Sequence, residues 1–358
     1  MSTVKAKTNP VSAHSGELNR QNFSHRVAIV VGVVTAVGLA LIFVYYLADV
    51  LLIAFAGLLL AIFLRGLTNY FSHLTGIPAG WSLAIVGVAL LVLVGGGGWL
   101  LAPDLTSQLA QLSMSLPESI EQLRQRLQQY SWSEQFLSEL PSMQNALFSR
   151  LDILSRATGL VSRTLGLLTN LALILFIGIY VAVNPTLYKE GLLKLIPADK
   201  RPRAREVLHD VGHTLERWLI GRSLSMLVIG VLTTIGLQLI GLPLALTLGL
   251  LAAILSFIPY IGPILSVIPP ALLAFSESSA AVIYVGLLYL AIQLFESYLL
   301  TPLIQKRAVN LPPALTITWQ VALSVLVGFT GLVLATPLVA TIFVLVKRLY
   351  IEDVLHDR

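Results

Sequence analysis

Long apolar runs separated by short polar stretches dominate the hydrophobic pattern of this chain. No Asp, Glu, Lys, Arg or His occurs between Arg222 and Glu277, and none occurs between Arg307 and Lys347. A helix needs about 20 apolar residues to cross a hydrocarbon layer of roughly 30 Å, so the pattern predicts an all-α, polytopic integral membrane protein. It has nominally eight membrane segments, which are Val27–Ala48, Val50–Leu64, Trp81–Ala102, Leu160–Val183, Ser223–Ile240, Ala245–Phe275, Ala280–Leu300 and Ala314–Val346.

Composition and charge narrow the class further. Of the 358 residues, 56% are hydrophobic and 11% are charged, whereas roughly 25% are charged in a soluble domain. A water-soluble enzyme is therefore excluded, and the absence of cysteine excludes disulfides, thiolate catalysis and Cys-type zinc sites. The net charge of +5 comes from cations that flank the apolar segments, which is the pattern of a membrane protein rather than of a nucleic-acid-binding surface. We expect no nucleic acid partner, no metal, no cofactor and no enzyme activity.

The positions of Lys and Arg predict the orientation of the segments. The polar tail 1–26, the amphipathic segment 184–222 and the tail 347–358 carry many of the cations. These parts are therefore expected in the cytoplasm, with both termini inside a bacterial inner (plasma) membrane. The segment 103–159 then lies outside and is expected to form two or three amphipathic helices. The other divisions are 27–102 with spans one to three, 160–183 with the fourth span and 223–346 as a transport core.

Two of the apolar blocks are too long for one crossing. Ala245–Phe275 has 31 residues, and Ala314–Val346 has 33 residues. Pro259 and Pro263 in the first block each remove a backbone donor and displace a carbonyl, so both are expected to break a straight helix there. A straight helix of 31 residues would measure about 46 Å, half again the hydrocarbon thickness. Each block is either a re-entrant broken hairpin or a tilted, kinked crossing. Two re-entrant hairpins would place Lys306 in the cytoplasm, and would give the inverted-repeat arrangement typical of secondary transporters.

Glu296 is the main candidate for transport chemistry. It is the only Asp, Glu, Lys, Arg or His between Glu277 and Lys306. A charge at the centre of a membrane helix costs about 2.5–3.5 kcal/mol on insertion scales and marks a pathway by default. The alternative is that Glu296 lies near the membrane face and pairs with Lys306 or Arg307. Gln293 lies three residues earlier on the same helix face, where it can share hydrogen bonds with Glu296.

Two further groups of residues are candidates for the transport pathway and its gating. Side chains and freed carbonyls in the first broken block can coordinate a cation or a polyol, unless the break is only a structural kink. The residues are Ser256, Pro259, Tyr260, Gly262 and Pro263. The second group has either a gating or hinge role or ordinary loop chemistry, and it comprises Pro302, Gln305, Asn310, Pro312, Gly328 and Gly331.

Three runs of sequence resemble the autoinducer-2 exporter family of bacterial inner-membrane proteins. They are LIPADKRPRAREVL (195–208), FIPYIGP (257–263) and ESYLLTPLIQKRAVNLPPALTI (296–317), and their order and spacing also resemble that family. The resemblance implies an eight-span permease with both termini inside and an outer domain between spans three and four. The family name refers to efflux of a quorum-sensing furanone, and other members resemble Na⁺/H⁺ antiporters.

The resulting functional expectation is a secondary membrane transporter that exports a small polar organic solute or signal. The first alternative is a Na⁺/H⁺ antiporter, and the second is a non-transporting membrane scaffold. The expected partners are a small-molecule solute, H⁺ or Na⁺, the lipid bilayer and further copies of the chain in a homo-oligomer.

Overall fold

The structure is a computed structural model that describes residues 47–127, 157–302 and 312–355, together with residues 35 and 38. The chain divides into two compact units, Met1–Leu51 and Leu52–Arg358. Most of the first unit, including most of the expected span Val27–Ala48, lies outside the described residues. All regular elements that the structure describes are helices, which confirms the all-α class.

The first described helices differ from the expected ones in their continuity. Helix Leu47–Thr75 is followed by α2 (Ala79–Leu91), which passes through the π-helical turn η1 (Val92–Gly96) into α3 (Gly97–Leu127). The expected third span and the start of the outer segment therefore belong to one helical run. α3 continues through both of its prolines. Tertiary packing stabilises α3 between its two prolines, because Leu112 is buried in a core cluster with residues of α7, α8 and α9.

A sharp bend separates α5 (Ala157–Val183) from α6 (Pro185–Lys194). The two helices meet at 88°, and Pro185 occupies the first position of α6, where its missing N–H costs nothing. The Arg65 side chain donates hydrogen bonds to the carbonyls of Ala182 and, at 2.9 Å, Val183. These bonds satisfy carbonyls that the end of α5 leaves without helical partners.

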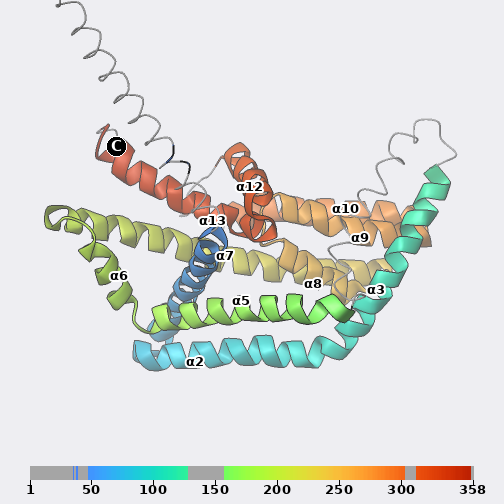
Figure 1. Cartoon of the computed structure of the whole chain (residues 1–358). Coiled ribbons are helices and arrows are strands. Elements are labelled where there is room, and N and C mark those ends of the chain that lie inside the picture. Colours follow the sequence, from blue (N-terminus) through green and yellow to red (C-terminus); the bar gives the residue numbers. More distant parts are fainter. Residues whose placement is uncertain (1–34, 36–37, 39–46, 128–156, 303–311, 356–358) are drawn as a thin grey trace, which may run out of the picture. The chain divides into compact units, whose positions relative to one another are not determined.

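The central helix is α7 (Arg201–Ile240), whose 40 residues extend for about 60 Å. Pro202 lies in its first turn, and Gly241 ends it in the left-handed conformation at φ 81°. α13 (Phe329–Val346) packs along its N-terminal half, and α8 (Ala245–Leu255) and α10 (Ser279–Phe295) pack along its C-terminal half (Figure 1). The expected fifth span is therefore only the C-terminal half of one longer helix.

The first oversized block is a helical hairpin of α8 and α9 (Ile261–Glu277). Ala245 and Leu248, at the start of α8, share a buried core cluster with Leu273 and Ala274, near the end of α9. The turn between them runs from Ser256 to Tyr260, where Tyr260 has a φ of 65°. Only Pro259 lies in the turn, so the prediction that both Pro259 and Pro263 break the helix needs correction.

Pro263 instead lies in the first turn of α9, where helices tolerate proline. Next to it, Gly262 allows the two helices to approach closely. A Cβ at Gly262 would lie 2.0 Å from the carbonyl oxygen of Leu255. The hairpin therefore depends on a glycine directly after its turn.

The second oversized block is also a hairpin, formed by α12 (Pro313–Val327) and α13. Gln320 Nε2 lies 3.2 Å from Thr336 Oγ1, although the two residues would be about 24 Å apart in a straight helix. Gly328 forms the turn with φ 73° and ψ −149°, a conformation that is open to glycine. Both oversized blocks thus fold back on themselves, and neither is one continuous kinked helix.

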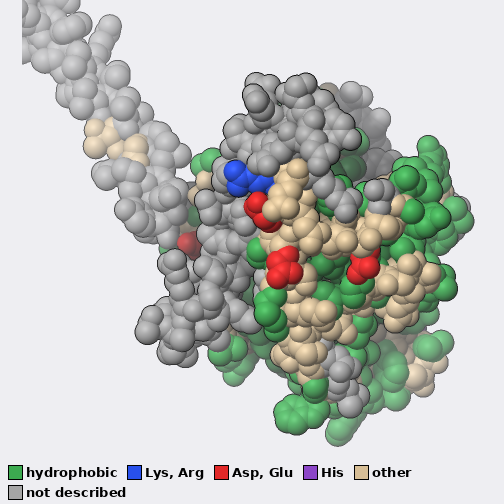
Figure 2. Space-filling model, turned by 90° about the vertical axis from the view of Figure 1, so that its right-hand side faces the viewer, with side chains coloured by type: hydrophobic (Ala, Val, Ile, Leu, Met, Phe, Trp, Pro, Cys, Tyr) green, Lys and Arg blue, Asp and Glu red, His purple; other side chains and the backbone are tan. Residues whose placement is uncertain are grey.

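Five helices in the described part of the chain are long and apolar enough to cross a membrane, or six if α5 and α6 form one bent span. The five are Leu47–Thr75, Ala79–Trp99, Ala198–Ile240, Ala280–Leu300 and Phe329–Glu352. Many large apolar side chains on these helices are exposed. Figure 2 shows hydrophobic side chains over much of the described part of one end of the molecule, with acidic side chains among them. The protein is a multi-pass membrane protein, but the nominal count of eight segments is not confirmed.

Candidate functional site

A buried ion pair lies beside the turn of the first hairpin. Arg222, near the middle of α7, donates from Nη1 to Glu296 Oε1 at 2.9 Å, and the two side chains are only 10% and 8% exposed. Glu296 begins the π-helical turn η4 (Glu296–Leu300), which continues α10. Arg222 Nε also donates to the carbonyl of Phe257 at 3.3 Å. The ion pair therefore joins α7, α10 and the α8–α9 turn at one point.

Gln320 joins the two hairpins to each other. Its amide nitrogen lies 3.0 Å from the carbonyl oxygen of Pro259, in the α8–α9 turn, and it also reaches Thr336 on α13. The Gln320 side chain is fully buried. We define the hairpin junction as these hydrogen-bonded groups, together with Ser256, the buried first residue of the α8–α9 turn. The bonded groups are Arg222, Glu296, Gln320 and Thr336 and the carbonyls of Phe257 and Pro259.

Three buried polar atoms of the hairpin junction form no hydrogen bond with any described group. They are Arg222 Nη2, Ser256 Oγ and Gln320 Oε1. Buried polar atoms in folded proteins usually have partners, because an unmet donor or acceptor costs about 1–3 kcal/mol. The junction thus combines a buried ion pair with one unmet cationic donor, one hydroxyl and one carbonyl acceptor, a set that can bind a polar solute.

The predicted pathway residues divide into three groups. Glu296, Ser256 and Pro259 contribute to the junction, while Tyr260, Gly262 and Pro263 lie at or directly after its turn. Gln293 is exposed, and its hydrogen bond at 3.4 Å goes to Ser297, not to Glu296.

The predicted hinge residues are spread more widely. Gly328 forms the α12–α13 turn, and Gly331 packs against the Leu323 carbonyl close to that turn. Pro312 immediately precedes α12, and Pro302 is exposed after η4. Gln305 and Asn310 lie outside the described residues, as do Lys306 and Arg307, the partners considered for Glu296.

Sequence reasoning missed three members of the junction, namely Arg222, Gln320 and Thr336. Two of them leave a signal in the sequence. Arg222 is the last charged residue before the long charge-free stretch, and Gln320 is the only amide side chain in Ala314–Val346. A lone polar side chain inside an apolar block is the same kind of signal that marked Glu296.

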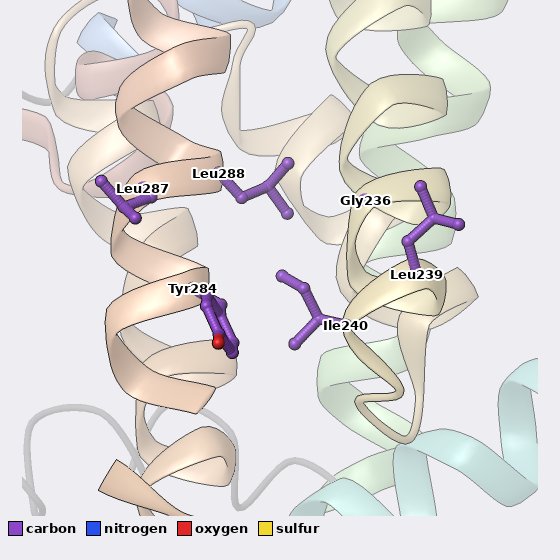
Figure 3. Close-up of a pocket in the computed structure, with 6 residues that line it drawn as sticks. All are labelled: Gly236, Leu239, Ile240, Tyr284, Leu287 and Leu288. Carbon is purple, nitrogen blue, oxygen red and sulfur yellow. The ribbon is translucent and has the colours of Figure 1, made fainter. Parts of the chain in front are cut away.

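A separate apolar groove lies between α7 and α10 (Figure 3). It has a volume of about 470 Å³ and is lined by Gly236, Leu239, Ile240, Tyr284, Leu287 and Leu288. Gly236 lies 14 residues along α7 from Arg222, or about 21 Å. The groove is therefore distinct from the hairpin junction, and its lining is that of a lipid-facing surface.

The fold and the junction together define a helical membrane protein in which a hydrogen bond joins two helical hairpins beside a buried ion pair. A family model described as AI-2E family transporter matches residues 33–351. The chain belongs to this family. It is 27% identical over 278 residues to "Putative transport protein YueF" of Bacillus subtilis (strain 168), which covers 74% of this chain and 75% of YueF.

Two other relatives carry similar names. "Putative transport protein YrrI" of the same strain is 29% identical over 283 residues, covering 76% of this chain and 79% of YrrI. "Putative transport protein YhhT" of Escherichia coli (strain K12) is 23% identical over 298 residues, covering 81% and 82% of the two chains. The similarity therefore extends over most of each protein and is not confined to one motif.

Proposed function

We propose that the protein is a secondary transporter that exports a small polar organic solute through the hairpin junction. The observation that carries the proposal is the buried Arg222–Glu296 pair at the point where the two hairpins meet. Charged residues inside membrane proteins are costly, so they mark solute or ion pathways by default. Interrupted helices that meet around such residues are the typical binding sites of secondary transporters.

The contacts of the junction also suggest how access can change. Arg222 holds α7 to α10, and Gln320 holds one hairpin to the other. Both turns contain a residue at positive φ, Tyr260 in the first and Gly328 in the second. A solute that replaces these contacts would release one hairpin from the other, and this is a differential interaction of the kind that shifts a two-state equilibrium.

The cations of the chain support an inner-membrane location with both termini in the cytoplasm. Lys189 and Lys194 lie in α6, Arg201 begins α7, and Lys347 follows α13. The open ends of the α12–α13 hairpin then face the cytoplasm, and those of the α8–α9 hairpin face the outside. The two hairpins enter from opposite sides, as in an inverted repeat.

A comparison of the metabolites that cells retain tests this proposal for any small polar solute. A strain that lacks the gene should retain at least one such solute, and the wild-type gene should restore its export. Glu296→Gln should restore less than about a tenth of the export at equal amounts of membrane-inserted protein, because it removes an interaction on which the pathway depends.

Glu190→Gln is the matched control for this experiment. It makes the same chemical change in the exposed pair with Arg205, whose side chains are 62% and 50% exposed, and exposed pairs contribute little. Export restored equally by Glu296→Gln and Glu190→Gln would contradict a role of the junction. The absence of any retained solute would instead favour a non-transporting scaffold.

A further inference from the structure

The guanidinium group of Arg222 is only partly used in the hairpin junction. Its Nη1 donates to Glu296 and its Nε donates to the Phe257 carbonyl, but Nη2 is buried and forms no hydrogen bond with a described group. A guanidinium group presents its donors as a planar fork that matches the two oxygens of a carboxylate. Arg222 therefore has an unused donor suited to an anionic oxygen.

We infer that the exported solute is a small hydroxycarboxylate, which binds Arg222 in place of Glu296 while Glu296 takes up one proton. This inference rests on the proposed transport function and assigns its substrate class. The solute carboxylate accepts from Arg222, and its hydroxyl donates to the unmet Gln320 Oε1. Ser256 Oγ lies in the same junction and can donate to the second carboxylate oxygen.

Charge balance explains why a proton accompanies the anion. In the structure the junction holds one positive and one negative side chain, so the pair is neutral when Glu296 is ionised. An added anion would leave a net negative charge at a buried position, which is costly. If Glu296 becomes protonated, the charge of Arg222 is balanced by the solute alone. Proton and anion then move together without net charge, and an acid produced in the cell can leave along its own gradient.

A cation substrate fits the junction less well. The guanidinium charge of Arg222 repels a cation at Glu296, and this repulsion is weakly screened at a buried site. Within the described residues, no three His, Cys, Asp or Glu side chains come together in a way that could hold a metal ion. The unmet atoms also include a charged donor, which a cation cannot use.

Among the residues that the structure describes, few titratable groups can compete with Glu296 for the proton. Arg222 faces it from α7, and Tyr260, in the α8–α9 turn, is close enough to interact electrostatically with Arg222. α8, α12 and α13 contain no Asp, Glu, Lys, Arg, His or Tyr, and the only such residue in α9 is Glu277 at its far end. Proton uptake at the junction can therefore be assigned to Glu296 by one substitution.

Binding to the purified full chain tests the inference with defined probes. Glycolate and lactate are compared with their neutral amides, glycolamide and lactamide, while proton uptake is followed in weakly buffered solution. We expect at least one of the acids to bind with one proton taken up, so that its affinity rises about tenfold for each unit of pH lowered. Glu296→Gln should bind that acid with no proton uptake and no pH dependence. The amides should not bind.

Two arginine variants complete the experiment. Arg222→Lys keeps the charge but loses the fork, and should bind the acid at least tenfold more weakly. Arg222→Gln combined with Glu296→Gln keeps the junction neutral, so it provides a folded variant if the single changes do not fold, and it should not bind. The inference is overturned if neither acid binds, if the amides bind equally well, or if wild-type binding takes up no proton.

These outcomes separate the inference from the proposed function. If the retained solute is a neutral polyol whose export depends on Glu296, the transport role of the junction is supported. The assignment of an anionic substrate is then overturned. Proton-linked binding of an acid, together with full export by Glu296→Gln, would overturn the transport role of the junction.

Discussion

Arg222→Gln is expected to destabilise the protein by about 3–5 kcal/mol, because it leaves Glu296 buried without its partner. The loss should be measured as a lower midpoint of thermal or denaturant unfolding in detergent. Transport should also be lost, since the same side chain holds the α8–α9 turn through the Phe257 carbonyl. A purified variant with wild-type unfolding would contradict the buried ion pair.

Two control variants identify the cause of this destabilisation. Arg205→Gln makes the same change in an exposed ion pair and should shift stability by less than about 1 kcal/mol. The double variant Arg222→Gln, Glu296→Gln removes both charges and should recover much of the stability, because a neutral amide pair carries no unpaired charge. It should not recover transport. Equal instability of the single and double variants would mean that the lost hydrogen bond, and not the unpaired charge, is the cause.

Gly262→Ala is expected to prevent the α8–α9 hairpin from closing. The new Cβ would lie 2.0 Å from the Leu255 carbonyl oxygen, and a backbone atom cannot rotate away as a side chain can. Overpacking typically costs about 1–3 kcal/mol and occasionally more. We expect a loss at the upper end of that range or beyond it, seen as a lower yield of folded protein and a lower unfolding midpoint.

Gly286→Ala is the matched control for this change. Gly286 lies in α10, and no neighbouring atom comes within 4 Å of a Cβ placed there. Alanine is favoured over glycine in a helix by roughly 0.5–1 kcal/mol, so the control should be neutral or slightly stabilising. If Gly262→Ala behaves like Gly286→Ala, the two helices do not approach as closely as the structure shows.

The sequence predicted the helical class and the breaks because both depend on local features. Apolar length indicates a membrane helix, and proline and glycine within it indicate where the helix is interrupted. The break in the first block was predicted correctly, but its extent was not. Pro263 looked equivalent to Pro259, although it begins α9. A proline interrupts a helix in its interior but is tolerated in its first turn. Local sequence alone does not show where the next helix starts.

The candidate site was only partly predictable because its contacts join distant parts of the chain. Glu296 stood out as a lone carboxylate, but its partner Arg222 is 74 residues away and lies at the boundary of a predicted span. The structure has no boundary there, because Arg222 lies within α7, a continuous helix of 40 residues. Likewise, the contact of Gln320 with Pro259 depends on both hairpins folding back, so no helical periodicity indicates it.

The most direct test of the central claim is alkylation of a cysteine placed in the hairpin junction. The chain contains no natural cysteine, and Ser256→Cys replaces a fully buried hydroxyl with a thiol of similar shape. Ser297→Cys is the control, because Ser297 is exposed just after Glu296. The exported solute is measured in the same vesicles before and after treatment with a small thiol reagent. We predict that Ser256→Cys transports more slowly than the wild type before treatment, because a thiol is a weaker donor than a hydroxyl. It should react while transport proceeds and then lose the remaining transport, whereas Ser297→Cys reacts and remains active. Continued transport by Ser256→Cys, whether its thiol is alkylated or never reacts, would show that the solute does not pass through the hairpin junction.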